Sequence, residues 1–270
     1  MDLLPAAILG LVQALTEFLP VSSSGHLVLS KILLGLETEH GAAFEVAVHF
    51  GTLLSVLVVF RREVGGLIKS AWAALTQLTR IKERWDEDEE LRLLGAIFLG
   101  CIPAGVVGLT FKDQLEAAFD SPMVVCIALI GTGFVLLATV RAPQGERGVS
   151  LGAAAVIGVA QAVAIIPGVS RSGSTIAAAM FLGVERERAA RYSFLLSLPV
   201  IAGATLLKAR ELLETQIPSD TWWALGVGAA VSFIAGIGAL LVLMSVVRRG
   251  GFAHFGWYCL LIGIGGLIAL

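Results

Sequence analysis

Charged residues are scarce in this chain of 270 residues. Only 15% are Asp, Glu, Lys or Arg, whereas 57% are hydrophobic and the mean hydropathy is +0.88. A soluble domain has about a quarter charged residues, so this composition excludes an ordinary soluble protein. The 3 cysteines lie in apolar runs without metal-ligand spacing, which argues against disulfides and a cysteine metal site. The basic residues form no stripe, so we expect no nucleic-acid partner.

Instead, the chain has a series of apolar segments near the length that spans a membrane. We predict an all-α integral membrane protein with a single membrane domain over residues 1–270. No charged region or small-residue cleavage site follows the first Met, so we do not expect a removable signal peptide. A polar cytoplasmic connection, residues 61–90, is predicted to be a solvated loop. The predicted spans are residues 42–60, 91–110, 121–140, 192–207, 222–247 and 252–270.

Two further apolar stretches are interrupted by a proline and a Ser/Gly-rich turn, at residues 13–26 and 161–174. With a constant offset of 148, residues 10–37 align without gaps on residues 158–185, and ten of 28 positions are identical. We interpret this as an internal duplication, with repeat one over about 1–140 and repeat two over about 151–270. Hydrocarbon cannot solvate free backbone groups, so each turn is predicted to be re-entrant and to line a watery cavity where the repeats meet.

The distribution of basic residues predicts that the two repeats have inverted topology. If residues 42–60 end inside and both turn segments return to the side they entered, fourteen Lys and Arg lie inside and three lie outside, namely Lys112, Lys208 and Arg210. The positive-inside rule favours this arrangement. It gives six transmembrane helices, two re-entrant helix-turn-helix pairs and both termini outside. A first segment that spans fully would change the count, and the sequence does not decide between the two.

Glu17 and Arg171 are the strongest indications of a functional site. A carboxylate in an apolar segment costs roughly 3 kcal/mol to insert and usually faces a partner in a cavity. Arg171 stands where repeat one has Ser23, and its planar guanidinium suits a bidentate phosphate contact. A salt bridge between Glu17 and Arg171 is the other interpretation and is compatible with the first. Gln13 could orient a water or a metal, but its counterpart Gln161 argues equally for a shared structural role.

The two turns add hydroxyls and backbone N–H groups, and each opens a short helix whose positive end favours an anion. His26 follows the first turn and could serve as acid, base, nucleophile or metal ligand, although a lone histidine usually has none of these roles. Glu45 and His49 lie one helical turn apart within a predicted span. We expect both to line the cavity in a supporting role.

Residues 13–26 and the motif Pro-Gly-x-Ser-Arg-Ser-Gly-x-Thr at residues 167–175 resemble the two signatures of the bacterial undecaprenyl-pyrophosphate phosphatase family, the bacitracin-resistance type. The resemblance covers the whole chain in length and motif spacing. It extends to Phe44-Glu45-Val46 and to Ser193-Phe194-Leu195-Leu196. The first acidic position of the motif is Gln13 here, so Glu17 must carry the carboxylate role.

The resemblance implies hydrolysis of undecaprenyl pyrophosphate to undecaprenyl phosphate and inorganic phosphate, which recycles the lipid carrier for cell-wall synthesis. It implies a bacterial plasma (inner) membrane location, a site facing the periplasmic side, and a divalent cation (Mg or Ca) near Glu17 and Gln13. Expected partners are the polyprenyl pyrophosphate lipid and membrane lipids, and the sequence allows a homodimer. Candidate catalytic residues are Glu17, His26, Ser23 and Arg171. Candidate substrate-binding residues are Ser22, Ser24, Ser170, Arg171, Ser172, Gly173, Ser174 and Thr175.

The nucleophile stays open between Ser23, His26 and a water molecule. The rival function is a transporter that flips polyprenyl phosphate, because inverted repeats with broken helices are common in transporters. A transporter needs the anion cradle but no acid, base or nucleophile, so Glu17 and His26 favour the enzyme. A purely structural scaffold leaves Glu17 and Arg171 unexplained.

Overall fold

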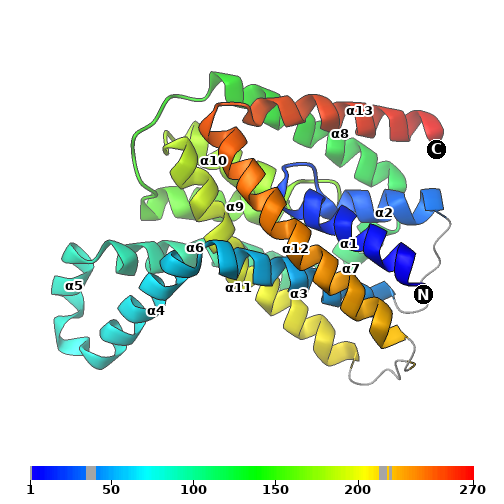
Figure 1. The fold of residues 1–270 in the computed structure, drawn as a ribbon. Coiled ribbons are helices and arrows are strands. Elements are labelled where there is room, and N and C mark those ends of the chain that lie inside the picture. The colour runs from blue at the N-terminus through cyan, green and yellow to red at the C-terminus, as the bar shows by residue number, and fades with distance from the viewer. Residues whose placement is uncertain (1, 35–40, 213–217, 219–220) are drawn as a thin grey trace.

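The computed structural model describes residues 2–34, 41–212, 218 and 221–270, and only the backbone of residues 31–34, 41–42 and 211–212 within these ranges. Gly35, Leu36 and Glu37, at the end of the first repeat motif, lie outside the described residues. The elements in the described part of the chain are helices. Figure 1 shows long helices arranged around two short, broken pairs.

Five described helices are long and apolar enough to cross a membrane. A sixth span is reached if α3 (Gly41–Val59) is joined to α4 (Arg61–Thr76), from which it is bent by 82°. The prediction of an all-α integral membrane protein is therefore confirmed, while the inversion of the repeats stays a prediction. The five are α6 (Glu89–Thr110), α12 (Thr221–Arg248), residues Arg186–Arg210 of α11 (Arg186–Leu212), α8 (Pro122–Ala138) with the 3₁₀ turn that extends it to Arg141, and α13 (Phe255–Ala269) with the 3₁₀ turn that begins it at Phe252.

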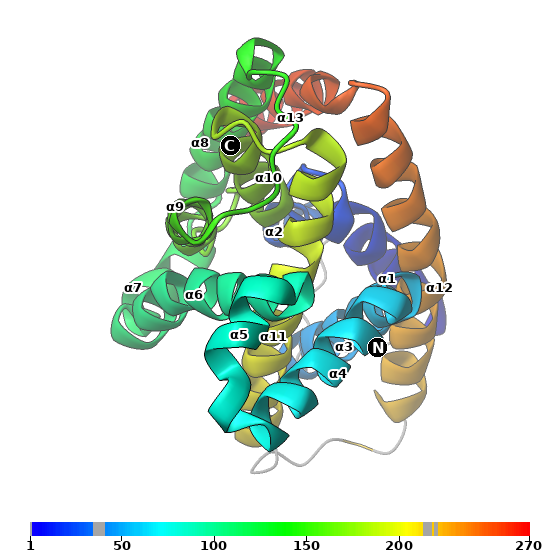
Figure 2. The same ribbon diagram turned by 90° about the vertical axis from the view of Figure 1, so that its left-hand side faces the viewer.

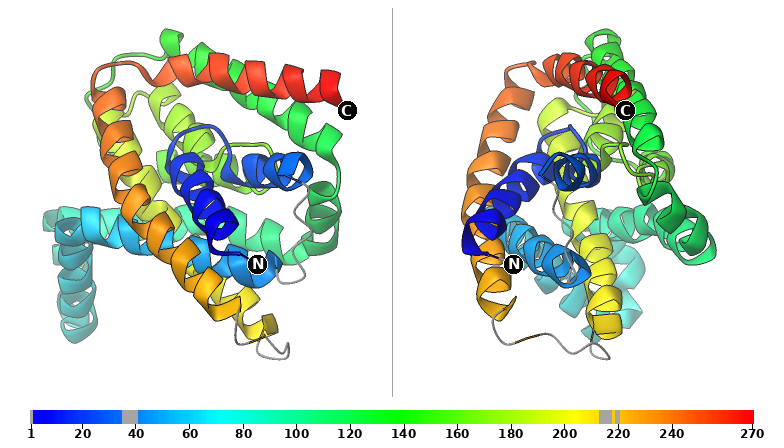
Figure 3. Two further views of the ribbon diagram at one scale, coloured as in Figure 1. Left: turned by 45° about the vertical axis from the view of Figure 1, so that its right-hand side comes forward. Right: turned by 90° about the vertical axis from the view of Figure 1, so that its right-hand side faces the viewer.

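The two interrupted stretches form pairs of shorter helices, as predicted. The first pair is α1 (Leu3–Phe18) and α2 (Ser23–Leu34), and the second is α9 (Leu151–Val163) and α10 (Arg171–Phe181). At 1.5 Å per residue, the 16 residues of α1 and the 13 of α9 fall short of a hydrocarbon core of about 30 Å. The left view of Figure 3 shows the first pair and its turn framed by the long helices, and the right view shows α1 at the edge of the molecule beside α12.

The two repeats pack through matching glycines. A Cβ atom on Gly10 of α1 would lie 2.6 Å from the carbonyl oxygen of Gly228 in α12. A Cβ atom on Gly158 of α9, the counterpart of Gly10, would lie 2.6 Å from the carbonyl oxygen of Gly100 in α6. Each first half-helix thus packs backbone to backbone against one long helix, α1 on α12 and α9 on α6. These equivalent contacts support the internal duplication.

The polar connection 61–90 is helical, which differs from the predicted loop. It consists of α4, a 3₁₀ turn (Leu78–Arg80) and α5 (Ile81–Glu87), and it projects from the body of the molecule (Figures 1 and 2). Most of its side chains from residue 75 onward are exposed, and the solvation of this segment stays a prediction. The short connection at 111–120 is likewise helical, as α7 (Lys112–Phe119).

Asp88 fastens this projecting segment to the membrane domain. It is the N-cap of α6, where its side chain accepts hydrogen bonds from the backbone N–H of Leu91 at 3.1 Å and from Ser70 Oγ at 2.7 Å. Arg84 Nη2 adds an ion pair at 2.9 Å. Burial alone would raise the pKa of Asp88, but these hydrogen bonds and the Arg84 charge hold it below its usual value. Asp88 therefore remains ionised and caps the helix.

Aromatic packing fixes the end of α1, where Glu17 is located. Phe18 is fully buried, and its ring meets that of Phe194 in α11 edge to face with centroids 5.9 Å apart. Phe194 also stacks on Phe60 at 6.0 Å. Such pairs contribute about 0.5–1.5 kcal/mol each beyond the burial of their surface. The backbone next to Glu17 is thus anchored to the long helix α11 of repeat two.

Candidate functional site

The two Ser/Gly-rich turns contact each other where the repeats meet. A Cβ atom on Gly25 would lie 3.2 Å from Cα of Gly168, and one on Gly173 would lie 3.3 Å from Cβ of Pro20. Gly25 and Gly173 are counterparts at the offset of 148, and so are Pro20 and Gly168. The turns therefore cross in a nearly symmetrical way, and small residues permit their close approach.

Each turn caps its second half-helix with an equivalent serine. Ser22 Oγ accepts a hydrogen bond from the backbone N–H of Gly25 at 3.3 Å, and Ser170 Oγ accepts one from the N–H of Gly173 at 3.1 Å. Ser22 has a φ of 68°, a left-handed conformation that is uncommon for serine. These contacts satisfy helix N–H groups that would otherwise lack partners. Both serines therefore also hold the shape of the site.

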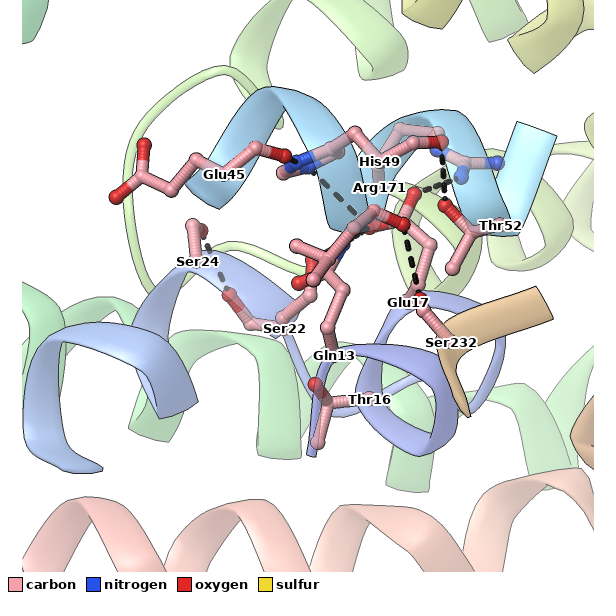
Figure 4. A network of polar contacts seen from close by, with 12 residues as sticks. Gln13, Thr16, Glu17, Ser22, Ser24, Glu45, His49, Thr52, Arg171 and Ser232 are labelled. Atoms are coloured by element: carbon pink, nitrogen blue, oxygen red, sulfur yellow. Dashed lines mark hydrogen bonds and ion pairs between the residues drawn. The ribbon is translucent and has the colours of Figure 1, made fainter. Parts of the chain in front are cut away.

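Glu17 is the centre of the polar network between the turns, shown in Figure 4. Its Oε1 accepts a hydrogen bond from Arg171 Nη2 at 2.6 Å, which joins the two repeats by an ion pair. Its Oε2 accepts from Ser23 Oγ at 2.7 Å and from Gln13 Nε2 at 3.1 Å. His49 Nε2 lies 3.9 Å from the same oxygen. The side chains of Glu17 and Arg171 are only 7% and 16% exposed, so the predicted salt bridge is confirmed as a buried one.

Two polar atoms of this network have no hydrogen-bond partner among the described residues. They are Nη1 of Arg171 and Oε1 of Gln13, and both are buried. A buried donor or acceptor without a partner is destabilising by about 1–3 kcal/mol, so each such atom in a folded protein calls for an explanation. The Arg171 atom is a cationic donor at a cavity, which suits an anionic ligand.

Two cavities meet at the Glu17–Arg171 pair. The smaller, of about 180 Å³, is polar on the side of the turns, and the larger, of about 250 Å³, is mainly apolar. Such a junction offers polar groups to a charged head group and apolar walls to a hydrocarbon chain. The smaller cavity is lined by Thr16, Glu17, Ser22, Ser23, Ser24, Phe119, Ala164, Ile165, Val169, Ser170 and Arg171.

The larger cavity has a polar edge formed by α3 and α11. Glu45 and His49 line it, as predicted, and His49 Nδ1 lies 2.8 Å from the carbonyl oxygen of Glu45. Lys208 lines it too, and its Nζ donates to Glu45 Oε2 at 3.0 Å. The sequence interpretation had placed Lys208 only among the outer cations. Its position directly after the apolar segment 192–207 was the available signal.

His26 lies outside both cavities. Its Nδ1 is 2.9 Å from the carbonyl oxygen of Ser22, and its Nε2 is 2.8 Å from the hydroxyl of Tyr258 in α13. The two rings are stacked, with centroids 5.5 Å apart and planes 8° apart. Both ring nitrogens are therefore engaged in contacts that hold the first turn. The structure does not bring His26 to Glu17 or Arg171.

Of the predicted substrate-binding residues, Ser22, Ser24, Ser170 and Arg171 line the cavities, and four others do not. Thr175 is fully buried and shares a hydrogen bond of 2.6 Å with Ser193 of α11. The remaining three, which are also outside the cavity linings, are Ser172, Gly173 and Ser174.

Thr132 of α8 is a supporting residue that the sequence interpretation missed. Its Oγ1 donates to the carbonyl oxygen of Gly168 at 3.1 Å and accepts from the backbone N–H of Ser170 at 3.2 Å. Gly168 has a φ of +93°, which favours glycine. Thr132 therefore fixes the second turn immediately before Arg171. A hydroxyl between two glycines within a span was the only signal for it.

Comparison with known proteins gives a consistent result over the whole chain. The family described as bacitracin resistance protein BacA matches residues 6–265. A relative from Salinibacter ruber, named undecaprenyl-diphosphatase, is 46% identical over 259 residues, which cover 96% of each chain. A second from Desulforapulum autotrophicum, with the same name, is 44% identical and covers 100% of this chain and 99% of its own. A third from Korarchaeum cryptofilum, also so named, is 41% identical over 98% of both chains.

Proposed function

Because the chain belongs to the bacitracin resistance protein BacA family, we propose that it is an undecaprenyl-diphosphatase. It hydrolyses undecaprenyl pyrophosphate to undecaprenyl phosphate and inorganic phosphate, and so recycles the lipid carrier for cell-wall synthesis. The observation that carries this function is the Glu17–Arg171 pair of 2.6 Å at the junction of a polar and an apolar cavity. A lipid diphosphate, with an anionic head and a hydrocarbon tail, matches that junction.

Arg171 is the main phosphate-binding group in this proposal. One of its terminal nitrogens holds Glu17, and Nη1 has no protein partner in the described chain and can donate to a phosphate oxygen. In phosphoryl transfer, negative charge spreads over the oxygens of the transferred group, and cationic donors at fixed positions stabilise it. The hydroxyls of Ser24 and Ser170 line the same polar cavity and assist as donors.

Ser23 is the nucleophile that the geometry supports best. Its hydroxyl donates to Glu17 Oε2 at 2.7 Å, and Arg171 and Gln13 orient that carboxylate. A nucleophile, a base in hydrogen-bond reach and a group that orients the base is the arrangement of covalent catalysis. Ser23 Oγ bonds to the distal phosphorus and gives its proton to Glu17, while undecaprenyl phosphate leaves with the bridging oxygen. Water then attacks the serine phosphate, which restores the hydroxyl and releases inorganic phosphate.

Direct attack by water, with Glu17 as base, would give the same products. Trapping of phosphorylated Ser23 by acid quench distinguishes the two routes. Catalysis by His26 also stays a prediction. The geometry does not support it, since both ring nitrogens have partners away from Glu17. The transporter that flips polyprenyl phosphate is not favoured, since the relatives are named as diphosphatases.

A divalent cation, Mg²⁺ or Ca²⁺, is part of the proposal. Glu17 provides carboxylate oxygens and Gln13 an amide oxygen that is buried without a partner, and both are hard donors of the kind these cations prefer. The described residues contain no group of three His, Cys, Asp or Glu for a cage made by protein alone. The donor set therefore fits a cation whose other ligands are water and substrate phosphate. When bound, the cation would neutralise phosphate charge.

We further propose the bacterial plasma membrane as the location, with the site open to the periplasmic side. The excess of Lys and Arg in the connections assigned to the inside supports this orientation.

The homodimer allowed by the sequence also stays a prediction. The molar mass of the purified protein in detergent, determined by light scattering with correction for bound detergent, tests it.

The proposed function is tested by phosphate release from farnesyl diphosphate by the purified protein in detergent, with magnesium or with EDTA. We expect metal-dependent release that falls about 10²-fold or more in Glu17→Gln, which removes the base. Arg171→Lys, which keeps the charge but loses the planar fork, should lose about 10²–10³-fold. Glu116→Gln, at an exposed carboxylate of α7, is the matched control and should keep full activity. No release from well-folded protein would instead favour the transporter, to be tested by flipping in vesicles.

A further inference from the structure

Gln161 of α9 is the counterpart of Gln13, but the two glutamines have different surroundings. Gln13 Nε2 donates to Glu17 Oε2 at 3.1 Å, one helical turn further along α1. In repeat two the residue one turn further along is Ile165, so Gln161 has no carboxylate to bind. The same amide therefore stands at equivalent positions in both repeats, and among the described residues only the first copy has a protein partner for its nitrogen.

Gln161 is a buried amide without a partner at either end. Its side chain belongs to a residue that is 1% exposed, and neither Nε2 nor Oε1 has a hydrogen-bond partner among the described residues. Because both atoms lack partners, the amide group would be equally unsatisfied if it were rotated so that its nitrogen and oxygen changed places. A buried polar group of this kind is destabilising unless a ligand or a water molecule completes it.

The position of Gln161 indicates which ligand this is. It lines the mainly apolar cavity of about 250 Å³ and not the smaller polar one, whereas Arg171 lines both, and Nη1 of Arg171 is also buried without a partner among the described residues. Two unpartnered N–H donors at one cavity require acceptor oxygens, and phosphate offers several on one atom. The free Oε1 in addition requires a donor, which bound water supplies.

We propose that Gln161 is a further substrate-binding residue, in which Nε2 donates to an oxygen of the phosphate group that Arg171 also holds. Its Oε1 accepts a hydrogen bond from a water molecule in the cavity. This inference deepens the proposed function and rests on it, because it takes a diphosphate as the ligand. It also assigns different roles to the two duplicated glutamines: Gln13 orients Glu17, and Gln161 contacts the ligand.

The test compares Gln161→Met with Gln13→Met, since methionine matches glutamine in length and has no amide. Two quantities are measured on the full-length protein in detergent. The first is kcat and KM for farnesyl diphosphate. The second is the thermal midpoint with and without inorganic diphosphate. The pair is a matched control, because both positions are buried in equivalent half-helices.

We expect Gln161→Met to keep or raise the thermal midpoint, because an apolar side chain of the same shape removes two unpartnered groups. Its kcat/KM should fall about tenfold to a hundredfold, mainly through KM, as for a lost hydrogen bond to a charged group. The shift of the midpoint by inorganic diphosphate should shrink in parallel. Gln13→Met should lower the midpoint, because Glu17 loses a donor.

The inference is overturned if Gln161→Met lowers the midpoint as Gln13→Met does and leaves KM unchanged, which is the behaviour of a structural residue. Should the methionine variant fail to fold, Gln161→Glu decides, since it is isosteric but places a negative charge beside the phosphate. We expect a larger rise in KM there, and an unchanged KM refutes the contact. If the wild type releases no phosphate but inorganic diphosphate stabilises it through Gln161, the enzyme proposal fails and the binding site stands.

Discussion

Replacing Arg171 alone should destabilise the protein, and replacing Glu17 as well should restore most of the lost stability. In Arg171→Met the Glu17 carboxylate, 7% exposed, loses its cation. Breaking a buried ion pair in this way costs about 3–5 kcal/mol, whereas replacing both charges by neutral groups is often close to neutral. Ser23 and Gln13 still donate to the carboxylate, so we take the lower end, about 3 kcal/mol. At about 2–4 °C per kcal/mol, the thermal midpoint should fall roughly 6–12 °C.

The measurement is a double-mutant cycle of Arg171→Met, Glu17→Gln and the double variant, followed by tryptophan fluorescence during heating in detergent. The double variant should regain a midpoint within about 3 °C of the wild type, because no unpaired charge is left. It should stay inactive, because both groups of the proposed mechanism are missing. A single variant Arg171→Met that melts within about 2 °C of the wild type, or a double variant as unstable as that single one, would refute a buried, mutually dependent pair.

Two further predictions concern the scaffold. Gly158→Ala should lower the thermal midpoint by several degrees, because its Cβ would lie 2.6 Å from the carbonyl oxygen of Gly100. Gly152→Ala is the control and should leave the midpoint unchanged, because nothing lies within 4 Å of its Cβ. Equal midpoints for the two variants would contradict the close packing of α9 on α6. Tyr258→Phe should keep the ring stack on His26 but remove the hydrogen bond, which lowers the free energy of unfolding by about 1 kcal/mol and leaves kcat nearly unchanged. A large fall in kcat would instead indicate that His26 takes part in catalysis.

The sequence predicted those features that depend on neighbouring residues. The breaks after Phe18 and Val163 follow from proline and Ser/Gly turns, and the structure has helix ends at both. The meeting of Glu17 with Arg171 was one of the two interpretations of these residues, because a carboxylate is costly in hydrocarbon without a partner. These signals are local, or arise from a strong energetic demand, and therefore survive without knowledge of the fold.

The remaining features depend on contacts between distant segments. The engagement of His26 by Tyr258 joins positions 232 residues apart, and that of Thr132 with the second turn joins α8 to repeat two. Lys208 reaches the cavity because α11 passes beside Glu45 of α3. A hydroxyl within a span, or a cation near its end, is compatible with many surroundings, so no pattern in the sequence identifies these partners. They are determined by how the helices pack.

The chemistry of the site arises where the duplicated halves differ. The packing glycines and the capping serines are the same in both repeats, so the two turns meet through equivalent contacts. The repeats differ, however, at two positions of the crossing. Glu17 of repeat one corresponds to Ile165 in repeat two, and Arg171 of repeat two corresponds to Ser23 in repeat one. Had the repeats remained identical, the crossing would hold two carboxylates or two guanidinium groups, which repel each other in a buried site. Divergence at these positions instead places a cation and a hydroxyl each within 3 Å of the Glu17 carboxylate, and the proposed hydrolysis of a diphosphate uses all three groups.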